Sequence, residues 1–343
     1  MTSLLQRKRR KPIVASVVVL AVAAAALAGW AYLQWAAEPA VGLITKTNTN
    51  PFFIKMAEGA ESSARIKHLR LLKAAGRSDG DHESQVVALK SMIDAGVRAV
   101  LITPNDAKAI VPELQKARDK GVLVIALDSP TDPPQAVDAT FGTNNFEAGR
   151  LVGGYAKGLM KGREPKIAML DAFAGHAVGT QRHNGFLVGM GLGTASLATA
   201  EAVKSDAVVC TADTYGDREK GREGMARCLR EHPEINLVYT LNEPVAAGAR
   251  LALAAAGRGN VPIVSIDGGC QGVRDVASGS IAATAQQYPL SMATEGVASA
   301  AEYIRSGRKP ARFIDTQAIL ITDAPQPGVD SRNTRFGLSA CWG

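Results

Sequence analysis

The sequence predicts two doubly wound α/β lobes arranged in tandem, on three observations. Short continuous apolar stretches, typical of buried parallel strands, alternate with segments whose apolar residues recur at helical spacing. Four such strand-then-helix units follow one another, which favours a parallel sheet with right-handed crossovers. The alternation stops at a breaker-rich segment, residues 131–134, and then begins again. A chain of 343 residues is also too long for one small core.

The first lobe opens with an apolar strand at residues 41–44, followed by a clear helix start. Asn50 is a good N-cap, because its side-chain oxygen can accept a free amide of the first turn. Pro51 suits the first helical position, where no N–H is needed, so a helix is expected over residues 54–64. The same patterns predict strands at residues 68–73, 97–102, 122–127 and 139–142, and helices over residues 84–95 and 107–120.

The alternation that resumes after Thr143 has the same character. The Ala- and Thr-rich stretch 191–204 fits neither period and is interpreted as a variable surface excursion. Helices are predicted over residues 146–160, 180–190, 217–231, 243–256 and 289–306, and strands at residues 166–171, 206–210, 236–241, 261–266, 281–285 and 316–321.

The net charge of +7 does not indicate nucleic-acid binding, because five positive charges lie in the single run 7–11 and the remainder is nearly balanced. Residues 12–37 carry no charge and are long enough to span a bilayer as a helix. This pattern predicts either a secretory signal peptide or an uncleaved membrane anchor, over residues 1–37. Residues 26–28 offer a cleavage site, whereas Trp30, Tyr32 and Trp35 resemble interfacial anchors. Either way, the chain from about Glu38 is expected in the periplasm or on the outer face of the cytoplasmic membrane.

The four cysteines all lie in the part of the chain that is expected to be exported. An even number of cysteines in an oxidising compartment favours disulfides. No C-x-x-C spacing occurs, which weakens a zinc or redox-motif interpretation, and we expect neither a metal nor a cofactor. We prefer the pairs Cys210–Cys228 and Cys270–Cys341, and four buried thiols are the alternative.

Polar side chains follow several of the predicted strands, at the carboxyl ends where open α/β sheets bind ligands. Each one alone is more simply a helix cap or turn residue, but together they describe a cleft between two lobes. Amide and carboxylate groups pair with hydroxyls, and an aromatic face suits the C–H face of a sugar. The candidate residues are Asn48, Asn50, Phe52, Phe53, Asp128, Asn242, Glu243, Asp267 and Gln287.

An ordered set of motifs resembles the type I periplasmic sugar-binding proteins of the ribose-binding class, which feed ABC importers. The resemblance covers essentially all of residues 41–343, and its fructose-binding branch is the most similar, through residues 42–47, 239–244, 265–270 and 341–343. The motifs are Asn50-Pro51-Phe52-Phe53, Ala126-Leu127-Asp128, Arg182-His183-Asn184-Gly185-Phe186, Leu241-Asn242-Glu243-Pro244, Ile266-Asp267-Gly268 and Ala283-Thr284-Ala285-Gln286-Gln287.

This resemblance implies two lobes joined by a three-strand hinge. The N-lobe would comprise residues 41–143 plus 288–315, and the C-lobe residues 144–287 plus 316–343. It also implies a monomer without enzymatic activity that binds a small-molecule sugar and delivers it to an ABC permease with its ATPase in the membrane. No nucleic-acid partner is expected.

The resemblance also assigns roles to individual residues. Asn50 matches a ligand of sugar hydroxyls, Phe52 and Phe53 match stacking aromatics, and Asp128 matches a carboxylate that accepts from two hydroxyls. Asn242, Asp267 and Gln287 match hydrogen-bonding residues of the second lobe and hinge.

Two positions depart from the ribose binders. Those proteins carry arginine where this chain has Ser129 and Thr180, and Arg182 lies two residues beyond the second position. Lys46 and Glu243 would supply replacement charges. We therefore expect a fructose-like ketohexose or a related polyol rather than ribose.

Other classes of protein share parts of this pattern. An extracellular sugar-sensing lobe of a chemoreceptor or kinase is the main alternative, and an uncleaved anchor would favour it. A regulator of the lactose-repressor type needs a polar helix-turn-helix, and residues 12–37 are apolar throughout. A dinucleotide enzyme is disfavoured because its glycine motif at residues 189–193 follows a predicted helix instead of a strand. His176 and His183 have no nucleophile or metal-ligand spacing beside them, so no catalytic residue is expected.

Overall fold

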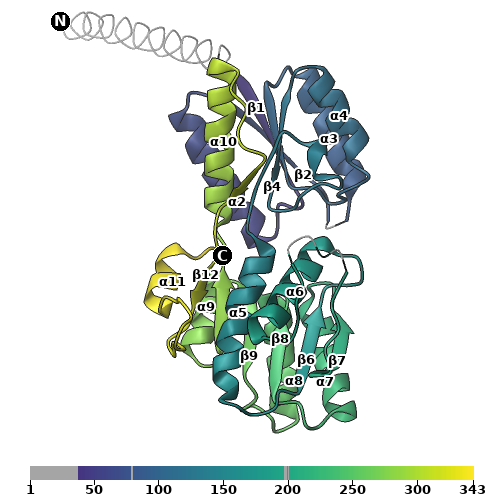
Figure 1. Ribbon diagram of the computed structural model, residues 1–343. Coiled ribbons are helices and arrows are strands. Elements are labelled where there is room, and N and C mark those ends of the chain that lie inside the picture. Colours follow the sequence, from purple (N-terminus) through teal and green to yellow (C-terminus); the bar gives the residue numbers. More distant parts are fainter. Residues whose placement is uncertain (1–37, 79, 197–198, 200) are drawn as a thin grey trace, which may run out of the picture.

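The computed structural model describes residues 38–78, 80–196, 199 and 201–343. Within them the chain forms two α/β lobes, each built on a six-stranded sheet with a hydrophobic core on both faces (Figure 1). This confirms the predicted fold class. The expected signal peptide or anchor, residues 1–37, lies outside the described residues, and no helix among those described is long and apolar enough to cross a membrane.

The N-lobe sheet has the strand order β2-β1-β3-β4-β5-β11, and every neighbouring pair is parallel. Helices α2 and α10 cover one face of this sheet, and α3 and α4 cover the other. The elements are β1 (Ala40–Thr45), α2 (Pro51–Ile66), β2 (Arg70–Ala75), α3 (His82–Asp94), β3 (Ala99–Ile102), α4 (Val111–Asp119), β4 (Leu123–Leu127), the 3-10 turn η1 (Pro134–Ala136), β5 (Ala139–Gly142), α10 (Pro289–Ser306) and β11 (Phe313–Asp315).

The C-lobe sheet has the order β7-β6-β8-β9-β10-β12, and only the last pair is antiparallel. Helices α5 and α6 cover one face, and α7 and α8 cover the other. The elements are α5 (Asn145–Met160), β6 (Ile167–Asp171), α6 (Ala177–Met190), β7 (Val208–Asp213), α7 (Arg218–Glu231), β8 (Leu237–Thr240), α8 (Glu243–Ala255), β9 (Ile263–Asp267), α9 (Cys270–Ala277), β10 (Ala283–Gln286), β12 (Ile319–Ile321) and α11 (Thr334–Ala340).

The chain passes between the lobes three times: from β5 to α5, from β10 to α10, and from β11 to β12. The third crossing corrects the single strand predicted at residues 316–321. Residues 313–315 pair with β5 in the N-lobe, and residues 319–321 pair with β10 in the C-lobe. The polar residues 315–317 separate two short apolar stretches, and the prediction included only the second of them.

Helix boundaries differ from the prediction where capping is not visible in the apolar pattern. Helix α2 continues to Ile66, and His68 then has a positive φ of 53°, so β2 begins at Arg70 and not at residue 68. Helix α6 begins at Ala177, three residues before the predicted start, because His176 Nδ1 accepts a hydrogen bond from the Gly179 amide at 3.0 Å. The predicted cap of α2 is present: Asn50 Oδ1 accepts from the Phe52 amide at 3.0 Å.

Both disulfides have the pairing that we preferred from the sequence. Cys210 on β7 is bonded to Cys228 on α7, and Cys270 at the start of α9 is bonded to Cys341 beyond α11. The second disulfide closes a separation of 71 residues and ties the end of the chain to the C-lobe.

Helices α5 and α6 pack with their backbones in direct contact. A side chain added at Gly149 of α5 would overlap the carbonyl of Arg182, and one added at Gly185 of α6 would overlap the carbonyl of Phe146. Only glycine allows this approach, which sets where α6 lies and therefore where Arg182 lies.

We predict that Gly185→Ala lowers the free energy of unfolding by about 2 kcal/mol, because the added methyl group forces the two helices apart. Urea denaturation measures this change. Gly259→Ala is the matched control, since an added methyl group there meets nothing within 4 Å. Equal midpoints for the two variants would contradict the close helix contact.

Candidate functional site

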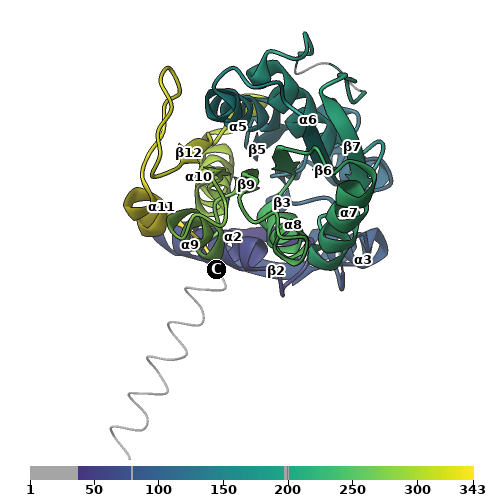
Figure 2. The ribbon, with the colours of Figure 1, turned by 90° about the horizontal axis from the view of Figure 1, so that it is seen from below.

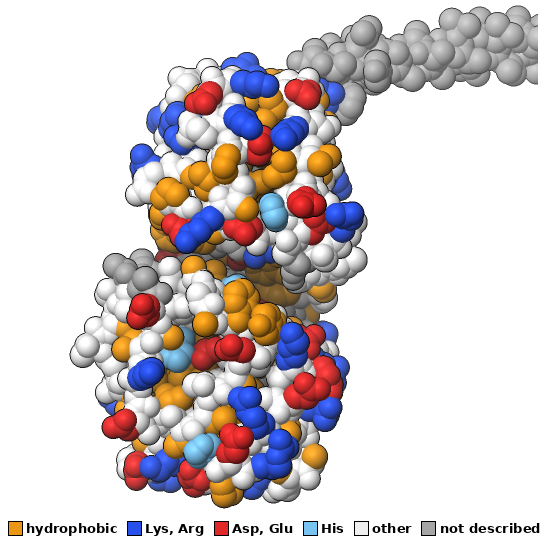
Figure 3. All heavy atoms as spheres, turned by 90° about the vertical axis from the view of Figure 1, so that its right-hand side faces the viewer, with side chains coloured by type: hydrophobic (Ala, Val, Ile, Leu, Met, Phe, Trp, Pro, Cys, Tyr) orange, Lys and Arg blue, Asp and Glu red, His pale blue; other side chains and the backbone are white. Residues whose placement is uncertain are grey.

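The polar residues predicted at strand ends come from both lobes, and Figure 3 shows these lobes as two rounded masses that meet at a narrow waist. Asn48 and Asn50 follow β1, and Asp128 follows β4 in the N-lobe. Asp267 ends β9 and Gln287 follows β10 in the C-lobe. The carboxyl ends of parallel strands lie along one edge of each sheet, which groups these residues on the edge of their lobe.

Asp267 is the centre of a hydrogen-bonded cluster in the C-lobe. Arg182 Nη1 donates to Asp267 Oδ1 at 3.3 Å, and Gln287 Nε2 donates to the same oxygen at 2.9 Å. The guanidinium of Arg182 is fixed by two further bonds, to Asn145 Oδ1 at 2.8 Å and to the Leu241 carbonyl at 2.7 Å. Arg182 is only 5% exposed.

Gln287 also carries an acceptor without a partner. Its side-chain Oε1 is buried and has no hydrogen-bond partner among the described residues, and Gln287 as a whole is 1% exposed. Because a buried acceptor left unpaired is costly, this oxygen is suited to accept a hydrogen bond from a ligand.

The charge of Asp128 in the N-lobe acts on the carboxyl group of Asp267 in the C-lobe. Burial raises the pKa of Asp267 to about 6, Arg182 lowers it, and the negative charge of Asp128 raises it. Carboxylates accept hydrogen bonds from hydroxyl groups, so a neutral molecule with several hydroxyl donors suits both residues.

Both acidic residues have an unusual backbone conformation. The φ angle is 62° at Asp128 and 139° at Asp267, in a region that L-residues other than glycine rarely adopt. At Asp128 the backbone N–H donates to the Phe141 carbonyl at 2.8 Å, and the Ser129 hydroxyl donates to Asp128 Oδ2 at 2.9 Å. Such conformations persist where the surroundings hold them, and they concentrate at functional sites.

Glu243, which we expected to contact the ligand, has a different role in the structure. Its carboxylate accepts from the amides of Gly268 and Gly269 at 2.8 and 3.0 Å, and from Thr284 Oγ1 at 2.7 Å. A side chain at Gly272 would overlap it. The carboxylate therefore supports the turn that follows Asp267 from inside the lobe, a role invisible in the sequence because its partners are backbone amides.

Asn242 lies beside Glu243 and caps α8. Its Oδ1 accepts from the Val245 amide at 3.1 Å, and its Nδ2 donates to the Gly216 carbonyl at 3.2 Å. Asn50 likewise uses its oxygen to cap α2. These two side chains thus have structural partners in addition to the ligand contacts expected of them.

The two phenylalanines of the first motif are almost fully enclosed. Phe52 is 7% exposed and Phe53 is 6% exposed, their rings meet edge to face at 5.4 Å, and both belong to the N-lobe core. Phe53 and Asn48 line a depression of about 440 Å³ beside β1. The ring faces of Phe52 and Phe53 are therefore not open for stacking on a sugar.

Aromatic residues that the sequence analysis missed are exposed instead at the ends of β6 and β7. Phe173 stacks on Tyr215 with ring centroids 5.1 Å apart, and His176 meets Phe173 edge to face at 5.0 Å. Phe173 is 41% exposed and Tyr215 is 60% exposed. Phe173 lies two residues after the strand predicted at residues 166–171, so the strand-end criterion would have found it had it included aromatic residues. Tyr215 was out of reach, because β7 ends at Asp213 and not at residue 210 as predicted.

The N-lobe approaches this aromatic group through Lys46. The pKa of His176 is lowered to about 4, mainly by burial and then by the positive charges of Lys46 and Arg182. His176 is therefore neutral near pH 7, as its acceptor role at the start of α6 requires.

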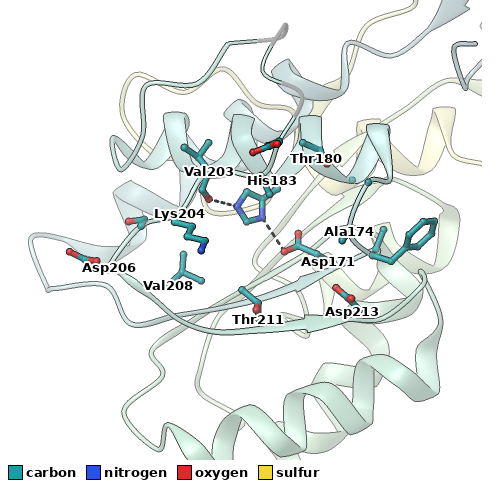
Figure 4. A pocket seen from close by; sticks show the side chains of 17 residues that line it. Asp171, Ala174, Thr180, His183, Val203, Lys204, Asp206, Val208, Thr211 and Asp213 are labelled. Atoms are coloured by element: carbon teal, nitrogen blue, oxygen red, sulfur yellow. Dashed lines mark hydrogen bonds and ion pairs between the residues drawn. The ribbon is translucent and has the colours of Figure 1, made fainter. Parts of the chain in front are cut away.

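Thr180 and Arg182 serve different parts of the C-lobe. Thr180 lines a cavity of about 950 Å³ between β6, β7, α6 and residues 201–206 (Figure 4). His183 lies at the centre of this view, and its ring nitrogens meet Asp171 Oδ2 at 3.0 Å and the Val203 carbonyl at 2.8 Å. The described part of the 191–204 excursion is thereby held against α6.

No group of three His, Cys, Asp or Glu side chains in the described part of the chain could hold a metal ion. The arrangement offers hydrogen-bond donors and acceptors on two facing surfaces, and it is suited to binding an uncharged polar molecule.

The buried carboxyl groups predict a pH dependence of stability. Burial, and after it the nearby charge of Asp267, raises the pKa of Glu243 to about 8. When the pKa of a carboxyl group is higher in the folded state than in the unfolded state, the folded protein binds more protons than the unfolded protein at pH values between the two pKa values. Stability is therefore lost as the pH rises from about 4.5 to about 8.

We expect the urea midpoint of the wild type to decrease as the pH is raised from 5 to 8, by an amount that corresponds to at least about 1 kcal/mol in the free energy of unfolding. In Glu243→Gln the decrease should be smaller. Glu231→Gln, at an exposed position on α7, is the matched control. Parallel pH profiles for wild type and Glu243→Gln would show that this carboxyl group does not titrate in the range.

Comparison with known proteins agrees with this geometry. Residues 41–309 match the family model described as periplasmic binding protein domain. The chain is 28% identical over 332 residues to the D-ribose/D-allose-binding protein of Pseudomonas aeruginosa, covering 93% of this chain and 99% of that protein. It is 27% identical over 293 residues to the ribose import binding protein of Escherichia coli K12, covering 85% and 94%.

A solved structure shares the arrangement of both lobes. It is an ABC transporter periplasmic solute binding protein from Actinobacillus succinogenes with bound D-allose, 25% identical, with a TM-score of 0.72 over 83% of this chain and 98% of that one. These matches confirm the resemblance to the ribose-binding class. The chain belongs to the periplasmic binding protein family, whose members named here are binding proteins and not enzymes.

Proposed function

We propose that this chain is the substrate-binding protein of an ABC-type sugar importer, which captures a monosaccharide between its two lobes and delivers it to a membrane permease. One observation carries the proposal: Asp128 and Asp267 stand at strand ends of opposite lobes, both at positive φ, and the charge of Asp128 reaches Asp267. The named relatives that bind ribose or allose support the same class of ligand.

In this proposal the N-lobe contributes Asn48, Asn50 and Asp128, and the C-lobe contributes Arg182, Asn242, Asp267 and Gln287. Arg182, Asp267 and Gln287 are already joined by hydrogen bonds, so little side-chain freedom is lost when the ligand arrives. Closure of the lobes about the three crossings then brings Asp128 onto the same sugar. The buried Gln287 Oε1 supplies an acceptor that a hydroxyl of the correct epimer satisfies.

The proposed setting follows from the family. The protein acts as a monomer in the periplasm or at the outer face of the cytoplasmic membrane, released from or held by residues 1–37. It passes the sugar to a permease whose ATPase lies on the other side of the membrane.

For the ligand itself we propose a fructose-like ketohexose or a related polyol. Ser129 and Thr180 stand where ribose binders carry arginines, which leaves more space and fewer donors than a pentose requires. The guanidinium of Arg182 is directed to Asn145, Leu241 and Asp267, so it does not replace the donor missing at Thr180.

We predict that Asp128→Asn, which tolerates the positive φ, weakens sugar binding about a hundredfold or more, because an amide cannot accept from two hydroxyls as a carboxylate does. Asp128→Ala is expected to abolish binding. Titration calorimetry of the exported protein measures both variants, and Asp119→Ala, exposed at the end of α4, is the control. Unchanged affinity in a folded Asp128 variant would remove this residue from the site.

We also predict that D-fructose or a matched polyol binds more tightly than D-ribose, by about tenfold for each polar group that ribose leaves unpaired. Competitive titration with D-ribose, D-allose, D-fructose and polyols tests this order. Ribose binding at least as tightly as fructose would refute the ligand assignment and leave the sugar-binding function standing.

A further inference from the structure

The last three residues of the chain form a tail that is fastened to the C-lobe. Cys341 is bonded to Cys270 at the start of α9, and the Cys270 amide donates to the Trp342 carbonyl at 2.9 Å. A side chain at Gly269 would meet the indole ring at 3.4 Å, so Trp342 lies directly on the turn that follows Asp267.

The other side of Trp342 contacts the N-lobe. Its ring meets Phe52 of α2 edge to face at 5.1 Å, and it packs against the N-lobe core. A side chain at Gly343 would meet Pro51 at 3.1 Å, which places the chain terminus against the first residue of α2. Figures 1 and 2 show the C-terminus at the waist, beside α9 and below α2.

The indole also contacts the second crossing between the lobes. Trp342 Nε1 donates to the Gln287 carbonyl at 3.3 Å, and Gln287 is the residue whose side chain holds Asp267. Trp342 thus touches the N-lobe helix start, the C-lobe turn and a crossing strand end at one point, and the disulfide keeps it there.

We propose that the tail 341–343 is a fourth connection between the lobes and that Trp342 is a positioning residue of the ligand site. This proposal rests on the proposed function. The three backbone crossings allow the lobes to rotate, whereas the contact between Trp342 and Phe52 exists only over a narrow range of lobe orientations. It favours the lobe orientation of this structure, in which the charge of Asp128 reaches Asp267.

Loss of the tail contact lowers the population of the orientation that binds, and the apparent affinity falls by the same factor. An edge-to-face aromatic pair with one hydrogen bond corresponds to about a tenfold change. Because Trp342 acts through Phe52 and Gln287 and not on the sugar itself, the preference among sugars should stay the same.

The test uses the full chain with D-ribose, D-allose and D-fructose as probes. The tail variants are Trp342→Ala, Trp342→Phe and the pair Cys270→Ser with Cys341→Ser. The pair Cys210→Ser with Cys228→Ser is the matched control, because it removes a disulfide between β7 and α7 without releasing the tail.

We expect Trp342→Ala and the Cys270/Cys341 pair each to weaken binding of all three probes about tenfold, with Trp342→Phe retaining most of the affinity. Combining Trp342→Ala with the Cys270/Cys341 replacement should weaken binding little more than either change alone, because both remove the same contact between Trp342 and Phe52. The control pair should bind within about twofold of the wild type. Affinities of the tail variants that equal the control would overturn the proposal.

Two further measurements do not depend on sugar binding. The radius of gyration from small-angle scattering should increase without ligand in the tail variants and not in the control. The chain has three tryptophans, so Trp30→Phe with Trp35→Phe leaves Trp342 as the only emitter. Its fluorescence should shift to the red when Cys270 and Cys341 are replaced. Unchanged scattering and emission would refute the tail connection, whether or not a probe sugar binds. Failure of every probe sugar to bind would instead count against the proposed function.

Discussion

The burial of the Asp267 carboxyl group beside Arg182, within reach of the charge of Asp128, is the constraint on which the rest of the site depends. The two carboxylates belong to different lobes, and each is held at a positive φ that its surroundings must maintain. Hydrogen bonds from Arg182 and Gln287 offset part of the cost of burying Asp267, and the Ser129 hydroxyl donates to Asp128. A ligand rich in hydroxyl groups replaces repulsion with two sets of hydrogen bonds, which is why lobe closure and ligand binding are coupled in this account.

The support for Asp267 extends far from the site. Arg182 reaches it only because α6 lies against α5 at a distance that glycines on both helices allow. Glu243 holds the following turn through two backbone amides, and Gln287 holds the carboxylate itself. The site therefore relies on helix packing, on a buried carboxyl group and on a lobe crossing together, and a change in any one of these is felt at Asp267.

The same side chains often serve both the fold and the proposed function. Asn50 and Asn242 cap helices with their oxygens, so the helix starts that form the two facing surfaces are fixed by residues also available to a ligand. At the waist, Trp342 links Phe52 to Gln287, although these residues belong to different lobes. Because the same residues serve both purposes, polar residues at strand ends indicate both the helix starts and the candidate ligand site in a doubly wound protein.

The sequence by itself determined the fold class, the order of most strands and helices and the acidic residues at strand ends, because periodicity, capping and strand-end chemistry are local. It did not predict helices α9 and α11 or strand β11. Tertiary structure alone decided the rest. Glu243 turned into the lobe because backbone amides from residues 268–269 reach it. The strand predicted at 316–321 forms only over residues 319–321, because residues 313–315, just before it, pair with the sheet of the other lobe. Phe173 and Tyr215 stand at the rim, while Phe52 and Phe53 are enclosed, because burial depends on what packs from distant parts of the chain. Such contacts join residues far apart in sequence, and no local pattern of amino acids records them.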